Sequence, residues 1–229
     1  LAGTQEVVAA ATEAGVFAME AMWTRFLPAV EAAREVVAWG RIGQVLGVQG
    51  DLCAYRPYNP ASRLWDPATG GGAILDLGVY TVSMAEAFLG AARQVHCVGR
   101  YAPNGVESAA TMSIGYAGGG TAALTCGFDV HGPAQMAVYG TKGWVEIQPR
   151  FHHPTTISVH RSGVLPRIIE AKQIGRGYAH ELMEVSDCLL AGQTQSATMP
   201  LSDTVEVMRV LESCLKQLGR PQEEAKVEI

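Results

Sequence analysis

The chain has 229 residues, of which 48% are hydrophobic and 17% charged, and its formal net charge is −5. This composition is typical of a globular protein, and at this length roughly 70% of the surface of the unfolded chain becomes buried. The 17 Lys and Arg residues form no cluster, which argues against nucleic acid or a membrane surface as a partner.

The sequence predicts a helix and a strand at its beginning. Apolar residues recur at helical spacing from Val7 to Ala14, Gly15 ends the helix, and the apolar run 16–19 has the length of a short strand. Such a pair is normally part of a βαβ unit, and no preceding segment supplies the remaining strands. We therefore expect residues 1–25 to be the last part of a domain that lies mostly outside this chain.

A second helix is predicted over 28–39, because Pro28 suits a first helical turn and a glycine follows the last residue. Alternating residues predict a strand over 45–52. A polar loop at 54–69 then leads to three glycines, which open an apolar helix over 73–89.

From residue 93 to about 162 the apolar pattern has a period of two, which predicts a largely antiparallel sheet. Segments 110–116 and 122–128 form a hairpin across a glycine-rich turn. Helices are expected over 178–191 and 202–218. The expected fold class is α+β, with an open, largely antiparallel sheet and helices on one face.

The cysteines indicate a reducing compartment. They are odd in number, far apart and mostly within apolar runs, so we expect buried free thiols at Cys53, Cys97, Cys126, Cys188 and Cys214. The N-terminus lacks the layout of a signal peptide, and we expect no apolar stretch as long as the ~18 residues of a membrane span. We expect a cytoplasmic protein.

The strongest candidate for a functional site is the segment from Gly70 to Tyr80. Its three glycines let backbone N–H groups approach a ligand at the positive end of a helix dipole. Asp76 and Tyr80 are four residues apart and share one helix side, where a carboxylate can orient a substrate hydroxyl while the phenol exchanges a proton with it. Alternatively, Asp76 solvates an exposed helix face and Tyr80 is a core aromatic residue.

A second candidate segment, Glu20 to Phe26, lies where the first predicted strand ends. Ligands of open α/β sheets bind beyond the carboxyl ends of strands, so Trp23 and Arg25 could stack on and hydrogen-bond a polyol. Equally, Trp23 could belong to the core and Arg25 could be a surface charge.

Metal binding is not expected. His180 and Glu181 begin a segment similar to the H-E-x-x-H zinc motif, but Glu184 replaces the second histidine and no further ligand set is apparent. His152 and His153 are adjacent in an expected loop, and neighbouring side chains on an extended chain point apart.

In their order along the chain, these segments resemble the glucose-fructose oxidoreductase/inositol dehydrogenase/rhizopine-catabolism (Gfo/Idh/MocA) superfamily, in particular its dimeric dihydrodiol and NADP-dependent xylose dehydrogenase branch. No single segment is specific, but the ordered set is, and it favours a functional role for Asp76 and Tyr80. The set comprises E-A-M-W-T-R-F at 20–26, R-L-W-D-P at 63–67, the motif at 70–80, G-T-K-G-W at 140–144, G-Y-A-H-E at 177–181 and M-P-L-S-D-T at 199–204.

The resemblance implies a Rossmann domain, with residues 1–25 as its last helix and strand, followed by an α+β domain at 26–229 whose open sheet forms a homodimer. It implies Tyr80 as the catalytic tyrosine and Asp76 as its neighbouring carboxylate. The expected ligands are a sugar or diol and the cofactor NADP or NAD. Substrate contacts are expected at Trp23, Arg25 and Arg63, and cofactor contacts at Glu20, Gly71 and Gly72.

Two hypotheses follow for the function. In the first, the protein is an NAD(P)-dependent dehydrogenase that moves a hydride to or from a carbinol carbon of a sugar or cyclic diol. This chain alone would then be inactive, because the family's Gly-rich fingerprint and its lysine-bearing Glu-Lys-Pro segment are not in its sequence. In the second, the chain is a non-catalytic sugar-sensing or dimerisation module, and the sequence upstream of Leu1 would distinguish the two.

Overall fold

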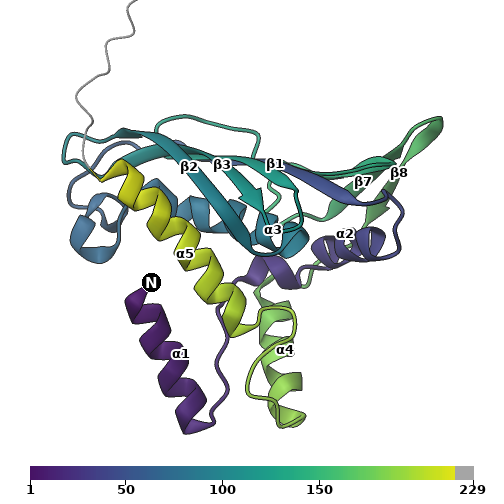
Figure 1. Ribbon diagram of the computed structural model, residues 1–229, viewed down its shortest axis with the longest axis horizontal. Helices are drawn as coiled ribbons and strands as arrows, with labels where there is room; N and C mark the ends of the chain where they lie inside the picture. The colour runs from purple at the N-terminus through teal and green to yellow at the C-terminus, as the bar shows by residue number, and fades with distance from the viewer. Residues whose placement is uncertain (220–229) are drawn as a thin grey trace, which may run out of the picture.

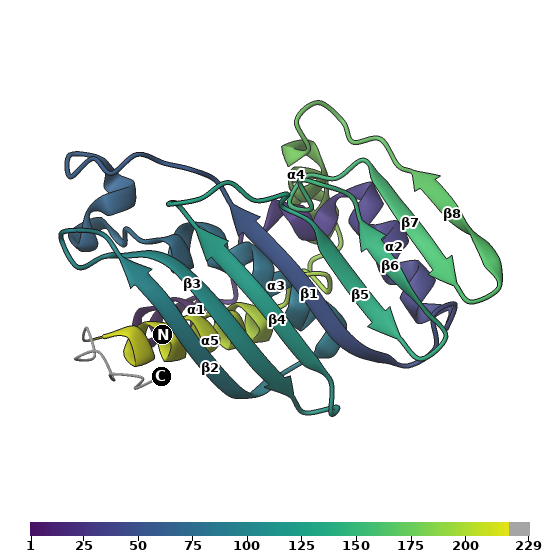
Figure 2. The same cartoon turned by 90° about the horizontal axis from the view of Figure 1, so that it is seen from above.

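The computed structural model describes residues 1–219, so residues 220–229 of the expected second domain lie outside it. Within the described residues one eight-stranded sheet forms a layer with the strand order β2-β3-β4-β1-β5-β6-β7-β8 (Figure 2). The strands are β1 (Val45–Cys53), β2 (Ala92–Tyr101), β3 (Glu107–Tyr116), β4 (Thr121–Gly127), β5 (Met136–Gly140), β6 (Gly143–Ile147), β7 (Thr156–Arg161) and β8 (Val164–Glu170).

The sheet is largely antiparallel, as the sequence predicts. Only β1 and β4 run parallel among the described pairs, and this contact joins the two halves of the sheet. The predicted hairpin is β3 against β4, with Ala110 opposite Cys126 and Met112 opposite Leu124. The α+β prediction with an open sheet is therefore confirmed.

Helices α2, α3 and α5 lie against one face of this sheet, whereas α1 and α4 project away from it on the same side (Figure 1). Helix α2 packs against β6 and β7, α3 against β1 and β4, and α5 against β2. Their bounds are α1 (Ala2–Ala14), α2 (Pro28–Ala38), α3 (Val79–Leu89), α4 (Tyr178–Leu190) and α5 (Leu201–Leu218).

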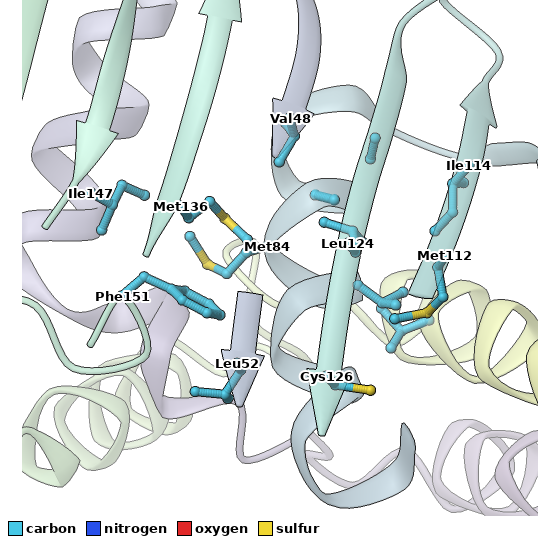
Figure 3. Packing of buried hydrophobic residues seen from close by; sticks show 14 of the residues in the cluster. Val48, Leu52, Met84, Met112, Ile114, Leu124, Cys126, Met136, Ile147 and Phe151 are labelled. Atoms are coloured by element: carbon cyan, nitrogen blue, oxygen red, sulfur yellow. The ribbon is translucent and has the colours of Figure 1, made fainter. Parts of the chain in front are cut away.

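The core lies between the helices and the inner face of the sheet (Figure 3). Met84 of α3 packs there near side chains from β1, β4 and β5. All five cysteines are buried and their thiols are free, as expected. The largest fully buried side chains include Phe128, Phe151, Leu27, Ile42, Ile74, Met84, Met112, Ile114 and Leu124.

The N-terminal segment matches the prediction only in part. Helix α1 forms and contacts α5, although none of its residues is buried. The predicted strand at 16–19 is wrong, because a strand needs a ladder of hydrogen bonds to a neighbouring strand. This segment instead donates from Val16 N to Ala11 O at the end of α1 and from Ala18 N to Thr194 O, at 3.0 Å, in a loop.

The predicted helix at 73–89 begins with an unexpected wide turn. Residues Ile74–Gly78 form a π-helical turn that continues directly into α3. Such turns are rare and occur often at functional sites. The stretch Pro67–Leu89 is, among the described residues, the one helix that is long and apolar enough to cross a membrane by length and composition, contrary to the sequence estimate. Half of its apolar window is buried within the protein, as in a core helix.

Candidate active site

Tyr80 and Trp23 are in contact at the beginning of helix α3. The indole Nε1 of Trp23 donates a hydrogen bond to the phenol oxygen of Tyr80 at 3.2 Å. Trp23 is 8% exposed and starts a short 3₁₀ turn directly before α2, so its ring has a fixed position. Because the phenol oxygen accepts this bond, its own proton stays available for a substrate.

The surroundings of Tyr80 keep its phenol protonated. Burial raises the pKa of Tyr80 above its ordinary value near 10, and the hydrogen bond from Trp23 opposes this shift. Negative charge on Tyr178, Asp76 or Glu181 raises the pKa further. At neutral pH the group is therefore suited to donate a proton, and its use as a base requires a nearby positive charge.

Asp76 lies in the π-helical turn and forms an ion pair with Arg63. Arg63 Nη2 and Asp76 Oδ1 are 3.2 Å apart, but the Arg63 side chain is 72% exposed. Such an exposed pair contributes at most about 1 kcal/mol to stability. The exposed pair therefore does little to hold the π-helical turn in place.

A cavity of about 340 Å³ brings several predicted residues together. Glu20, Asp76 and Tyr80 all line it, and Thr204 closes it from α5. The Thr204 hydroxyl is buried and has no hydrogen-bond partner among the described residues. The cavity is therefore lined by residues that carry two carboxylates, a phenol and an unpaired hydroxyl.

Sequence reasoning missed an aromatic cluster beside this cavity. The His152 ring is centred 5.9 Å from that of Tyr80, and Tyr178 packs on Trp23 at 4.6 Å. Burial lowers the pKa of His152 to about 4, so its ring is neutral. The adjacent His153 stacks on Trp23 at 6.0 Å. Tyr178 belongs to the G-Y-A-H-E segment that carries part of the family resemblance. The sequence does not show that its ring packs on Trp23; the structure does.

Comparisons with known proteins identify the family. Residues 30–146 match the GFO/IDH/MocA C-terminal domain. The chain is 32% identical to the trans-1,2-dihydrobenzene-1,2-diol dehydrogenases of Mus musculus and Homo sapiens, over 95% of its own length and 67% of theirs. This chain belongs to the Gfo/Idh/MocA family.

Solved structures of oxidoreductases share the fold of this Gfo/Idh/MocA chain. An aldose-aldose oxidoreductase from Caulobacter crescentus, in complex with glycerol, superposes with a TM-score of 0.82 at 25% identity and covers 96% of this chain and 67% of its own. A levoglucosan dehydrogenase in complex with NADH and levoglucosan gives 0.79 at 18% identity, with 90% of this chain and 65% of its own covered. The second likeness concerns the fold alone.

The glycines at 71 and 72 do not serve as the open anion site that the sequence suggested. Their backbone N–H groups donate to Asp66 O and Leu64 O within the protein. A Cβ at Gly71 would lie 2.7 Å from Asp66 N, and one at Gly72 would lie 2.0 Å from Glu107 Oε1. These glycines therefore permit close internal packing, and the expected cofactor contact at Gly71 and Gly72 does not fit the structure.

Glu107 itself occupies the start of this helix. Its Oε1 accepts a hydrogen bond from Ile74 N at 3.2 Å, and the residue is 7% exposed. A carboxylate at a helix N-terminus is stabilised by the helix dipole. Burial nevertheless raises the pKa of Glu107, and the hydrogen bond from Ile74 N opposes this shift. The glycine-rich start of the helix is therefore filled by a side chain of the protein itself. Of the three expected cofactor residues, only Glu20 faces the cavity beside Tyr80.

Arg25 has a structural position, contrary to the expected substrate contact. Its side chain is 2% exposed and forms ion pairs with Glu86 and Asp203. Its Nε donates to Ser83 Oγ at 2.9 Å and Nη2 to Ser83 O at 2.7 Å, while Nη1 also approaches Thr198 O at 3.5 Å. All five N–H groups are therefore used within the protein, which leaves none for a substrate.

Within residues 1–219, no group of three or more His, Cys, Asp or Glu side chains is placed to hold a metal ion. His180, which begins the zinc-like segment, accepts a hydrogen bond from Ile174 N at 3.0 Å through its Nε2. This hydrogen bond holds the imidazole against the loop before α4.

Proposed function

We propose that the protein is an NAD(P)-dependent dehydrogenase that acts on a CH–OH group of a sugar or cyclic diol. The observation that carries this proposal is the Tyr80 phenol, oriented by Trp23 and placed with Asp76 around one cavity. The names of the relatives, which act on a dihydrodiol, an aldose or levoglucosan, support the substrate class.

In this proposal the nicotinamide cofactor gives or takes the hydride, and the residues of this chain handle position and protons. During reduction, the Tyr80 phenol donates its proton to the oxygen of the former carbonyl group. During oxidation, Tyr80 must start as the phenolate, which takes the proton of the substrate hydroxyl and becomes the phenol; a positive charge near Tyr80 would be needed to lower its pKa for this direction. Asp76 accepts a hydrogen bond from a substrate hydroxyl and so holds the reacting carbon near the phenol.

The cofactor contacts in this proposal divide between the nicotinamide and the phosphates. Glu20 lines the cavity next to Tyr80 and could contact the nicotinamide side. The phosphates need another site, because the glycine amides at 71 and 72 are already used. We expect the chain 1–229 alone to be inactive, and the division at residue 25 and a cytoplasmic location stay predictions.

Self-association through the open face of the sheet also belongs to this proposal. Tyr139 of β5, Trp144 of β6 and Ile168 of β8 lie on the sheet face opposite the helices, and they are 40%, 40% and 67% exposed. Large apolar groups gathered on a sheet face favour a symmetric contact with a second copy.

The test is an activity assay of this chain together with any upstream domain that its gene encodes. With NADP⁺ or NAD⁺ and a panel of aldoses and cyclic diols, we expect formation of the reduced cofactor, measured by absorbance. Binding of a sugar without turnover by either cofactor would instead favour the non-catalytic sensing module.

A further inference from the structure

A groove at the outer edge of the sheet lies between helix α2 and strand β8, the last strand in the sheet order. Residues of α2, β7 and β8 line it together with Trp39 and Arg41, and its volume is about 390 Å³. Figure 2 shows β8 as the outermost strand on the side of the sheet where α2 lies. Volumes of roughly 300–1,000 Å³ are usual for sites that bind small molecules. No residue of the cavity beside Tyr80 lines this α2–β8 groove, so the proposed dehydrogenase reaction does not use it.

The register of the strands shows which side chains face the groove. Val159 of β7 lies opposite Arg167 of β8, so the two side chains share one face of the sheet. Val159 belongs to the core, which identifies this face as the one that α2 covers. Arg161 lies two residues after Val159 and also lines the groove. Because α2 leaves nearly all of β8 exposed, the space between the helix and these arginines is open to water.

The apolar part of the lining is unusually exposed. Trp39, which directly follows α2, is 65% exposed, and Leu165 of β8 is 89% exposed. Large apolar side chains gathered in one concave place are typical of a surface that binds a partner. The strand edge itself is protected against pairing with a further strand, because Pro166 has no N–H group to donate. The groove, and not the strand edge, is therefore the feature that an occupant would fill.

Three arginines add positive charge to the groove. Arg41 lies just beyond the C-terminus of α2, where the carbonyl end of the helix attracts a cation, so the helix alone accounts for it. Arg161 and Arg167 lack an acidic partner among the described residues. Within residues 1–219 the arginines that form ion pairs are Arg25, Arg63, Arg100 and Arg209. Glu35 supplies the negative charge of the described lining, so the three cations exceed it. Like charges in one groove repel one another, and an anion bound between them removes this repulsion.

We propose that the α2–β8 groove binds an organic anion that carries an apolar ring. Its carboxylate or phosphate group pairs with Arg161 and Arg167, whose planar guanidinium groups match either head group. Its ring packs against Trp39 and Leu165, which removes exposed apolar surface from water. The described lining includes no Ser, Cys, His or Lys residue, so the groove binds its ligand without reacting with it.

The first experiment measures binding to the full protein by calorimetry at low salt. The probes are 2-naphthoate, 2-naphthyl phosphate and the neutral 2-naphthamide, which share one ring system and differ in charge. At least one anion should bind about 10-fold more tightly than the amide, and the better anion identifies the head group. This preference should shrink as the salt concentration rises, because salt screens exposed charges.

Paired variants locate the binding. The double variant Arg161→Gln with Arg167→Gln should weaken binding of the preferred anion by about 10-fold and change the amide by less than about 2-fold. Arg93→Gln is the matched control, since Arg93 is an exposed arginine on the opposite edge strand β2, and it should change neither value. Leu165→Ser replaces a side chain that is almost fully exposed, so the variant should fold normally and bind all three probes about 3-fold or more weakly.

Two results would overturn the proposal. If Arg161 and Arg167 only keep the edge strand from pairing with other chains, the double variant will bind the anions as tightly as wild type. The same conclusion follows if wild-type protein binds both anions no more tightly than the amide. Either result leaves the proposed dehydrogenase function untouched, because the groove and the Tyr80 cavity have no lining residue in common.

Discussion

Replacing Arg25 by methionine should destabilise the protein strongly, because it removes the cation between two carboxylates. The Arg25, Glu86 and Asp203 side chains are 2%, 10% and 23% exposed, so Glu86 would be left most deeply buried. Removing one partner of a buried ion pair costs about 3–5 kcal/mol. We expect a loss at the lower end of this range, because Asp203 retains contact with water.

The loss should depend on pH in a defined direction. Burial raises the pKa of Glu86, and Arg25 is the main group that opposes this shift. Without Arg25, the folded-state pKa of Glu86 rises further above its unfolded value of about 4.5. The folded variant then binds a proton more tightly than the unfolded chain, so its stability rises as the pH falls through that raised pKa.

Urea denaturation of wild type and Arg25→Met at pH 8 and pH 5 measures both effects. The difference in the free energy of unfolding should be smaller at pH 5, and adding Glu86→Gln should recover part of the loss at pH 8. Arg63→Met is the matched control, and its exposed ion pair should matter by less than about 1 kcal/mol. A loss below about 1 kcal/mol for Arg25→Met, combined with weaker sugar binding, would refute the structural role and restore Arg25 as a ligand residue.

Three further predictions follow from the same contacts. Gly72→Ala should lower the free energy of unfolding by about 1–3 kcal/mol or more, and with it the melting temperature, because φ is +124° and the new Cβ would lie 2.0 Å from Glu107 Oε1. Gly118→Ala, with open space around it, is the control. Equal melting temperatures for the two variants would contradict this account. The folded-state pKa of His152, about 4, lies below its ordinary value of 6.5, so the unfolded chain binds more protons between these two pH values. The free energy of unfolding should therefore decrease as the pH is lowered from 6.5 to 4, by at most about 3 kcal/mol. Denaturant titrations should show that His152→Phe removes this dependence, and an unchanged pH slope would count against the buried neutral histidine. Light scattering at tens of micromolar should detect a dimer that Trp144→Lys disrupts, whereas a monomeric wild type would exclude self-association through the open face.

The sequence predicted the parts of the fold that depend on local pattern. The period of two predicted the β3–β4 hairpin, and the helices expected over 28–39, 178–191 and 202–218 match α2, α4 and α5 within a few residues. Strand β8 was missed because nearly all its residues are exposed, so no inward-facing apolar row marks it. The strand expected at 16–19 does not form, although its apolar run has the pattern of a strand, because no neighbouring strand lies beside it to form hydrogen bonds.

The candidate site was predictable only where neighbours in sequence are neighbours in space. Asp76 and Tyr80 share one side of a helix, and both line the cavity as the spacing suggested. The roles of Gly72 and Arg25 depend on Glu107 and Glu86, which come from distant segments and carry no local signal. A glycine is needed where the backbone comes close to a ligand, and equally where it comes close to a buried carboxylate. The glycines alone therefore could not distinguish a ligand site from internal packing.

The most direct test of the central claim is Tyr80→Phe, which removes one hydroxyl from the proposed dehydrogenase. A general acid/base group contributes about 10²–10⁴-fold, so kcat should fall by this order while KM changes less. A melting curve should show a loss of about 1 kcal/mol at most, the size of the lost hydrogen bond from Trp23. Turnover close to wild type, in a variant that folds normally, would remove Tyr80 from the chemistry and contradict the assignment of this site.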